Sequence, residues 1–446
     1  MKKTPPKVAV IGGGITGLTL AFELLEKGVD CILFEASNRV GGVIQTFSEN
    51  GFQIEGGPNS ILETHPEIGR LVERVGLERI SASAVAKKRF IVRNQQPIPL
   101  PTSPLGFIKT PLFSPAAKCR ILREPFVAPK KNEAESLAHF VERRLGKEFL
   151  DYAIEPFVGG VYAGNPEHLS TRYAFPKLYA LEADYGSIFR GAFVGARKRK
   201  QRLEKAAPHA TMFSFREGLE ALPRQLAKKL AGKIRLNHSI REIQRSPSGK
   251  WKIGEEDFST VVLALPAHAI AEIALPGDLS FLKKITHPPL VSLSLGFPVA
   301  SVPHPLDGFG MLIPRTEACF SLGALFMSSL FSNRAPDGAC LLTLFLGGAQ
   351  FPEQTALSEE DILKNALHDM RHLLGIQTPP LFHKTIFHPQ SIPQYNLGFG
   401  AILESMKTIE SKLPGLFFAG PCRDGISVGN AIRSAQKVAS RILEGF

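Results

Sequence analysis

Cysteine is scarce in this chain. The five cysteines are odd in number and far apart, and no two of them form a C-x-x-C pair: Cys31, Cys119, Cys319, Cys340 and Cys422. This pattern excludes a zinc knuckle and a redox-active dithiol, because both need closely spaced thiols. We interpret these residues as scattered buried thiols of a protein in a reducing cytoplasm.

Long apolar runs are absent as well. No stretch approaches the roughly 18 uncharged apolar residues of a membrane-spanning helix, and no apolar signal core follows the basic N-terminus. We therefore expect a protein that is soluble or lies on a membrane without crossing it. The twelve histidines are scattered without a recognisable partner pattern. The sequence thus nominates no catalytic base and no metal site.

Acidic residues are outnumbered, which gives a formal charge of +12 and favours an anionic partner. The densest run of cations spans residues 197–202. For such a run a solvated loop is the default, and contact with anionic lipid headgroups is the main alternative. No recognition motif for nucleic acid accompanies the charge, so we expect no nucleic-acid partner.

What the sequence does have is a dinucleotide-binding opening. Residues 8–11 are wholly apolar, as in a parallel strand, and residues 12–17 match G-x-G-x-x-G before a helical pattern. Gly12 allows the tight turn, Gly14 lets a pyrophosphate approach the backbone, and Gly17 permits close helix–strand contact. The helix N-terminus would face the negative charge.

Glu35 ends the second strand, residues 31–34, and supports the same interpretation. Its carboxylate would accept hydrogen bonds from the adenosine ribose hydroxyls, which argues against a 2′-phosphate there. The alternative is a structural glycine turn followed by a surface acid.

The C-terminal end carries a second strand-to-helix turn. An apolar strand at residues 416–419 ends at Gly420, and Gly425 precedes a helix with small residues in its first turn. The N-terminus of that helix would stabilise negative charge on a cofactor ring bound beside it. A helix that simply docks on the sheet would also prefer small residues.

The middle of the chain has a mixed pattern. Eight prolines interrupt apolar pieces between residues 97 and 129, which predicts a long irregular segment. Residues 133–155 and 358–374 follow helical spacing, and residues 290–346 alternate as strands do. We find no internal repeat.

The segment after Glu35 resembles a known cofactor signature. Residues 39–46, Arg-Val-Gly-Gly-Val-Ile-Gln-Thr, are similar to the R-x-G-G-x-x-x-T extension of the FAD-containing amine oxidase superfamily. The resemblance implies FAD rather than NAD, with Arg39 pairing with phosphate and the glycines passing the ribityl arm. Without it, Arg39 would equally suit a surface salt bridge.

From end to end the chain resembles the oxygen-dependent, FAD-containing protoporphyrinogen oxidase family, and the plant-type members in particular. The order and spacing of five segments carry this resemblance: residues 56–60, 156–166, 213–219, 322–336 and 392–395. Two departures from the plant-type pattern are Asn165, where an acidic residue is usual, and Gly429-Asn430 in the last helix.

The resemblance implies an α/β fold with a discontinuous Rossmann-like FAD-binding domain of the p-hydroxybenzoate hydroxylase or amine oxidase type. Residues 1–88, 212–275 and 411–446 would form this domain. Residues 89–96 and 276–410 would form an α+β substrate domain, and residues 97–211 a mostly helical, membrane-facing region. A lid folded onto the protein itself is the alternative for the proline-rich segment.

The resemblance also implies site residues. Arg93 would pair with a substrate propionate, the Gly164 carbonyl would accept from a pyrrole N–H, and Phe326 would stack on a pyrrole ring. From the residues alone, Arg93 equally suits a solvated strand end and Phe326 a core position. The implied cofactor-binding residues are Gly12, Gly14, Ile15, Thr16, Gly17, Glu35, Ala36, Arg39, Gly42, Val43, Gly57, Pro58, Asn59, Ser60, Ile240, Gly420, Ile426, Ser427 and Val428.

The implied activity is oxidation of protoporphyrinogen IX to protoporphyrin IX in haem biosynthesis. Successive hydride transfers to flavin N5 would carry it, with oxygen or another acceptor reoxidising FAD and no protein side chain nominated as catalytic. The nearest alternative is oxidation of coproporphyrinogen III, whose four propionates call for more cations. An amine oxidase, a carotenoid desaturase and a non-catalytic FAD-binding membrane adaptor are further alternatives. We expect a cytoplasmic monomer or homodimer, peripheral on a membrane.

Overall fold

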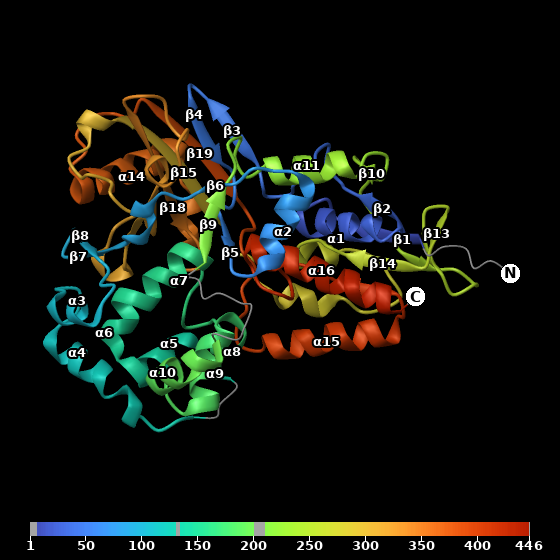
Figure 1. The fold of residues 1–446 in the computed structure, drawn as a ribbon, viewed down its shortest axis with the longest axis horizontal. Coiled ribbons are helices and arrows are strands. Elements are labelled where there is room, and N and C mark those ends of the chain that lie inside the picture. Colours follow the sequence, from blue (N-terminus) through green and yellow to red (C-terminus); the bar gives the residue numbers. More distant parts are fainter. Residues whose placement is uncertain (1–6, 131–133, 200–209, 446) are drawn as a thin grey trace.

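A parallel sheet forms one end of the molecule, a larger mixed sheet lies at the other, and a helical region lies below the mixed sheet (Figure 1). The computed structural model describes residues 7–130, 134–199 and 210–445. The predicted α/β class is confirmed.

The parallel sheet has five strands in the order β10-β2-β1-β14-β20, and every pairing in it is parallel. The strands are β1 (Lys7–Ile11), β2 (Asp30–Phe34), β10 (Ile234–Arg235), β14 (Thr260–Leu263) and β20 (Leu416–Phe418). The strands predicted at residues 8–11, 31–34 and 416–419 are thus confirmed to within one residue. Segments from both ends of the chain and from its middle therefore build one sheet.

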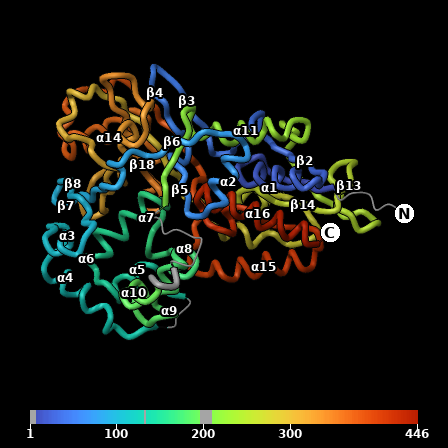
Figure 2. The backbone as a smooth tube through the Cα atoms, in the orientation of Figure 1, coloured from blue at the N-terminus to red at the C-terminus, as the bar shows by residue number. Residues whose placement is uncertain are grey.

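Helices cover both faces of the parallel sheet, which explains why β1 is apolar throughout. Val8 and Val10 point to one face, and Ala9 and Ile11 point to the other. The first face packs against α1 (Ile15–Glu26), α2 (Pro66–Val75), α11 (Ala221–Lys229) and α16 (Val428–Glu444). The second packs against α12 (Ala267–Ile270) and α15 (Phe399–Lys412). Figure 2 shows α1 and α16 side by side although they come from opposite ends of the chain.

The mixed sheet has seven strands in the order β19-β15-β18-β17-β16-β7-β8. Its strands are β7 (Phe90–Arg93), β8 (Gln96–Pro99), β15 (Leu290–Pro298), β16 (Gly310–Leu312), β17 (Gly323–Phe326), β18 (Ala339–Gly347) and β19 (Phe382–His388). The amphipathic helix predicted at residues 358–374 is α14 (Glu359–Leu374), which buries Ile362, Ala366 and Met370 against one face. Short helix α13 (Met327–Leu330) leads into β18.

The described residues also form three small sheets. Hairpin β3 (Thr46–Glu49) and β4 (Phe52–Glu55) contacts the mixed sheet, where the Phe52 ring fills the space beside Gly296. The second sheet comprises β5 (Ile61–Glu63), β9 (Thr211–Ser214) and β6 (Ile80–Ser81). The third comprises β11 (Gln244–Arg245), β12 (Trp251–Ile253) and β13 (Glu256–Phe258).

The helical region corrects two expectations. The proline-rich segment is not simply irregular, because Pro104 and Pro115 each occupy the first turn of a short helix, where proline is tolerated. The helical stretch expected at residues 133–155 is broken at Gly146, whose φ is +94°. The elements are α3 (Pro104–Lys109), α4 (Pro115–Leu122), α5 (Leu137–Leu145), α6 (Lys147–Phe149), the π-helix η3 (Leu150–Ile154), α7 (Glu155–Tyr162), α8 (Thr171–Ala174), α9 (Pro176–Tyr185) and α10 (Ile188–Arg199).

The basic run at residues 197–202 was expected as a solvated loop. Its first three residues instead belong to the last turn of α10, and residues 200–202 lie outside the described residues. Among the residues that the structure describes, no helix is long and apolar enough to cross a membrane. The proposed domain boundaries stay a prediction.

Candidate cofactor site

In the turn between β1 and α1, two glycines leave no room for a side chain. Gly12 has φ of +110°, and a Cβ added to it would lie 2.6 Å from the carbonyl oxygen of Ala264. A Cβ on Gly17 would lie 1.9 Å from the carbonyl oxygen of Gly12. The ideal Cβ of Gly14, in contrast, meets no heavy atom within 4 Å. The start of α1 is therefore open on the side where a pyrophosphate would approach.

Glu35 closes the turn from the second strand. One carboxylate oxygen accepts the Gly13 N–H at 2.6 Å, and the other accepts from the Ser37 amide and hydroxyl, both at 2.8 Å. The oxygen that accepts from Gly13 keeps one free lone pair, so a bond from a ribose hydroxyl remains compatible with this geometry. Ala36 beside it is exposed. The segment that carries Ile240 also reaches this point, because the His238 N–H donates to the Glu35 carbonyl at 2.9 Å.

The loop after Glu35 lies directly on the glycine turn. The Gly41 amide donates to the Gly13 carbonyl at 2.8 Å, and a Cβ on Gly42 would lie 3.4 Å from the Gly14 Cα. Arg39 braces this loop through bonds to the Gly42 carbonyl at 2.8 Å and to Gln45 Oε1 at 3.0 Å. Val43 is 66 % exposed. An apolar side chain standing open between glycine turns suits a flat ring above it.

Residues 57–60 join this loop from the next strand. A Cβ on Gly57 would lie 2.2 Å from the Val43 carbonyl oxygen, so the two segments touch. Gly57, Pro58, Asn59 and Ser60 are all half-buried. Asn59 donates to the Gly57 carbonyl at 3.3 Å, while its Oδ1 is buried without a hydrogen-bond partner in the described part of the chain. A buried acceptor of this kind calls for a donor from a bound group or from water.

The C-terminal turn completes the ring of segments. Gly420 has φ of +102°, and its ideal Cβ would lie 3.0 Å from Thr16 Oγ1 at the start of α1. The turn continues through Gly425 and half-buried Ile426 to Ser427, whose hydroxyl caps α16 by accepting the Asn430 N–H at 3.1 Å. Helix α16 begins at Val428, three residues after Gly425. The N-termini of α1 and α16 therefore meet at one place, above the carboxyl ends of β1 and β20.

Tyr395 has no predicted role, although it lies within residues 392–395, one of the segments that carry the family resemblance. Its hydroxyl donates to the Pro421 carbonyl at 2.6 Å and accepts the Gly425 N–H at 2.7 Å. Desolvation raises the pKa of this buried phenol well above its ordinary value. Tyr395 thus fixes the turn before α16, and no local signal marks it because its partners follow 26 and 30 residues later.

The three predicted substrate residues are already engaged. Arg93 pairs with Glu148 at 2.6 Å and lies 4.4 Å from the Tyr152 ring centre. The Gly164 carbonyl accepts from Gln350 Nε2 at 3.1 Å. Phe326 has no exposed surface and contacts the ring of Phe90 in the mixed-sheet core. This geometry gives no support to stacking by Phe326, and all three roles stay predictions.

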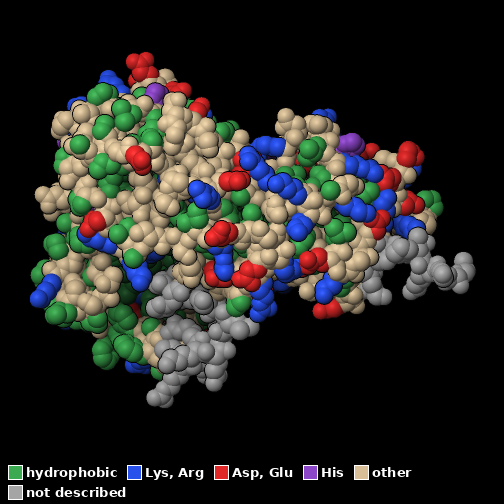
Figure 3. Space-filling view, turned by 45° about the horizontal axis from the view of Figure 1, so that its top comes forward, with side chains coloured by type: hydrophobic (Ala, Val, Ile, Leu, Met, Phe, Trp, Pro, Cys, Tyr) green, Lys and Arg blue, Asp and Glu red, His purple; other side chains and the backbone are tan. Residues whose placement is uncertain are grey.

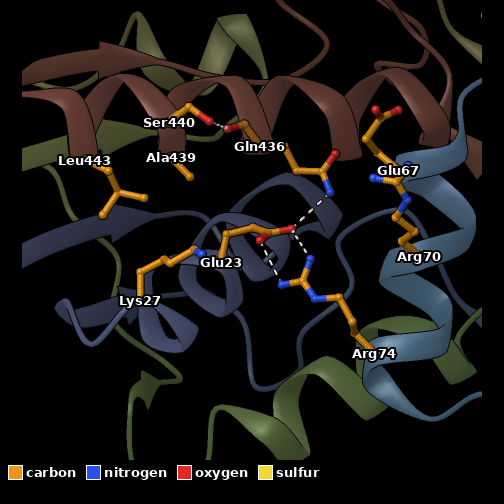
Figure 4. Close-up of a pocket in the computed structure, with 9 residues that line it drawn as sticks. All are labelled: Glu23, Lys27, Glu67, Arg70, Arg74, Gln436, Ala439, Ser440 and Leu443. Carbon is orange, nitrogen blue, oxygen red and sulfur yellow. Dashed lines mark hydrogen bonds and ion pairs between the residues drawn. The ribbon is translucent and has the colours of Figure 1, made fainter. Parts of the chain in front are cut away.

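A separate polar pocket lies between α1, α2 and α16 (Figure 4). Glu23 accepts from the Arg74 guanidinium at 2.9 and 2.8 Å and from Gln436 at 3.0 Å. Glu23 lies in the second half of α1, away from the glycine turn at its start. Because its main charges pair with each other, we assign this pocket no part in cofactor binding.

The fold and the glycine turns define a dinucleotide-binding flavoprotein. Residues 15–443 match a family described as flavin containing amine oxidoreductase. The chain belongs to this family, and FAD is its cofactor. The enzyme interpretation is confirmed over a non-catalytic adaptor.

Three individual proteins are similar to this chain over nearly its whole length. Protoporphyrinogen oxidase 2 of Arabidopsis thaliana is 32 % identical over 98 % of this chain and 94 % of its own length. Coproporphyrinogen III oxidase of Bacillus subtilis (strain 168) is 29 % identical over 98 % and 97 %. A solved structure from Exiguobacterium sp. 255-15, named as a candidate protoporphyrinogen oxidase, aligns with a TM-score of 0.82 at 24 % identity over 98 % and 99 %.

Proposed function

We propose that this protein oxidises protoporphyrinogen IX to protoporphyrin IX in haem biosynthesis. The observation that carries the proposal is the similarity to the Arabidopsis relative, which extends over nearly the whole of both chains. An intact set of glycine turns for the flavin supports it, because the chemistry depends on that cofactor. Oxygen or another acceptor would remove the electrons.

FAD supplies the hydride acceptor in such a reaction, and the chain supplies position and charge. The α1 N-terminus would face the pyrophosphate, and Glu35 would hold the ribose. The α16 N-terminus, held by Tyr395 through Gly425, would stabilise negative charge on the ring. This division of labour needs no protein base, in agreement with the scattered histidines.

The substrate would enter between the flavin segments and the helical region near Gly164. Arg93 pairs with the carboxylate of Glu148, and a substrate propionate would take the place of that carboxylate. Two glutamines lie next to Gly164. Gln350 donates to the Gly164 carbonyl, and Gln394 donates to the Tyr162 carbonyl at 2.8 Å. We place no ring on Phe326, because it lies in the core.

Oxidation of coproporphyrinogen III is the second candidate, and the similarity to the Bacillus subtilis enzyme favours it specifically. The two candidates separate in one assay. Purified protein is given each porphyrinogen in air, and the fluorescent porphyrin product is followed to obtain kcat/KM. We expect faster turnover of the IX isomer. Turnover of coproporphyrinogen III alone would replace the first candidate with the second.

We further propose that the helical region rests on a membrane surface. Large apolar side chains stand exposed there, among them Ile108 at 65 %, Phe126 at 84 % and Phe193 at 80 %. Hydrophobic side chains gather over this part of the molecule in the lower left of Figure 3. Such a surface, which also includes the exposed Arg190 of α10, suits insertion between anionic headgroups. A monomer or homodimer, peripheral on the cytoplasmic side, is consistent with it.

A further inference from the structure

A buried ion pair joins the flavin segments to the mixed sheet. Glu55 and Arg334 approach to 3.3 Å, and neither side chain has any exposed surface. Glu55 is the last residue of β4, directly before the glycines that lead into residues 57–60. Arg334 lies in the connection from α13 to β18. The two residues therefore meet where one part of the molecule is fixed to the other.

The Glu55 carboxylate collects two further segments of the flavin side. It accepts from the Thr46 hydroxyl at 2.7 Å, and Thr46 ends the loop that begins at Arg39. It also accepts the Leu219 N–H at 3.0 Å. The Glu55 carboxylate thus bonds to two segments, through Thr46 and Leu219, and Glu55 itself comes just before the third segment, residues 57–60.

Arg334 also bonds to the segments that surround Glu55. Its guanidinium donates to Ser214 Oγ at 2.7 Å, and its carbonyl accepts the Gln53 N–H at 3.1 Å. The preceding residue, Asn333, donates to the Arg216 carbonyl at 2.6 Å. A movement of the α13–β18 connection would therefore be passed on to β4 and to the glycines after it.

Burying the two charges of this pair costs desolvation free energy that their attraction must offset. Burial raises the pKa of Glu55 to about 7, against the opposing effect of Arg334, and burial lowers the pKa of Arg334. Buried ion pairs often add no net stability compared with apolar residues of the same size. Nη1 and Nε of Arg334 also have no hydrogen-bond partner among the described residues. Geometry rather than stability is what this arrangement provides.

We propose that Glu55 and Arg334 are positioning residues that hold the flavin-binding segments in register with the mixed sheet. The inference rests on the proposed function, because it takes residues 43 and 57–60 of the candidate cofactor site as flavin contacts. It concerns how firmly FAD is held and presented to a substrate, and neither side chain needs to touch either molecule.

The test is Glu55→Gln in the full-length holoenzyme, with Glu124→Gln as the matched control. Glutamine keeps the shape and one acceptor, while Arg334 loses its counter-charge. Glu124 is equally buried. It pairs with Arg144 at 2.8 Å, and neither of these side chains is exposed, but the pair lies in the helical region. We measure thermal unfolding, the rate of FAD release as flavin fluorescence, and KM separately from kcat.

For Glu55→Gln we expect about tenfold faster FAD release and a raised KM, together with a lower unfolding temperature because Arg334 is left as an unpaired buried charge. For Glu124→Gln we expect a lower unfolding temperature and unchanged FAD release. Glu55→Asp, which keeps the charge, should recover part of the FAD retention. A lower unfolding temperature for Glu55→Gln with wild-type FAD release would overturn the proposal.

The double variant Glu55→Gln with Arg334→Met covers the case in which the single variant fails to fold. It removes both charges and so leaves no buried ion unpaired. We expect it to fold and to release FAD faster than wild type, and wild-type release would again contradict the proposal. FAD release is measured without substrate, so a protein that turns over no porphyrinogen fails the proposed function while this test still reads out.

Discussion

The parallel sheet and the helical region use apolar residues in opposite ways. The sheet buries both faces under helices, and its surface openings coincide with glycine turns. The helical region leaves several of its largest apolar side chains exposed and buries charge instead, with Arg144 and Glu124 both fully enclosed. The first region has the openings that a ligand needs, and the second has the exposed apolar side chains on which the proposed membrane contact rests.

The largest effect should come from Gly17→Val in the glycine turn. The added Cβ would lie 1.9 Å from the Gly12 carbonyl oxygen, so the turn cannot keep its shape. We expect no flavin-containing protein, measured as visible absorbance after purification. Gly28→Ala at the other end of α1 is the control, because its Cβ meets nothing within 4 Å. That variant should lose about 1 kcal/mol and keep its flavin. A Gly17→Val protein that keeps its flavin would show that the glycine turn is not the cofactor site.

Arg144→Met should cause the next largest loss. Arg144 pairs with Glu124 at 2.8 Å and donates to the Val127 carbonyl at 2.8 Å, and its removal leaves a buried carboxylate unpaired. We expect about 3–5 kcal/mol less stability in urea unfolding. Arg441→Met breaks a half-exposed pair with Glu410 and should cost under about 1 kcal/mol. Equal losses in the two variants would show that burial is not what matters.

The paired change Phe126→Ser and Phe193→Ser should weaken membrane binding without affecting the fold. The two rings are 84 % and 80 % exposed, so they stabilise nothing inside the protein. We expect at least about tenfold weaker binding in sedimentation with anionic vesicles, given about 1.5–3 kcal/mol for each buried ring. Leu381→Ser, on a side chain 62 % exposed outside the helical region, should bind as wild type. Undiminished binding of the paired variant would point to a lid rather than a membrane face.

The smallest effect concerns Glu256, which bonds to Arg235 and to Lys7 at 2.7 Å at the edge of the parallel sheet. Bonds to these two cations lower its pKa to about 2. Because the folded pKa is depressed, the stabilisation is complete above the unfolded pKa of about 4.3 and is lost as pH falls toward 2. Glu256→Gln should cost under about 1 kcal/mol at pH 7 in urea unfolding, less in high salt, and nothing near pH 2.

The parallel sheet was predictable because its signals are local. An apolar strand, three glycines and a helical repeat lie within the first 26 residues, and the structure places them as β1 and α1. The span of α14 was predicted for the same reason, and the structure shows Ser358 as its N-cap and Gly375 at its C-terminal end. Its capping serine accepts the Asp361 N–H, which fixes the first turn.

The remaining features depend on contacts between distant residues. Glu55 and Arg334 are far apart in the sequence, and nothing near either one indicates the other. The partner of Arg93 is Glu148, in a short helix that the helical pattern did not separate from its neighbours. Phe326 matched a family position, but its burial is decided by the strands and rings around it. Local pattern therefore indicated the segments of the cofactor site, whereas the roles of Arg93, Gly164 and Phe326 stay predictions.

The account stands on a flavin, held between the N-termini of α1 and α16, that takes electrons from a porphyrinogen. Anaerobic mixing of the purified holoenzyme with protoporphyrinogen IX tests this most directly. We predict that the visible absorbance of oxidised flavin bleaches while porphyrin fluorescence rises, and that admitted air restores the absorbance. Flavin absorbance that stays constant with both protoporphyrinogen IX and coproporphyrinogen III would contradict the account.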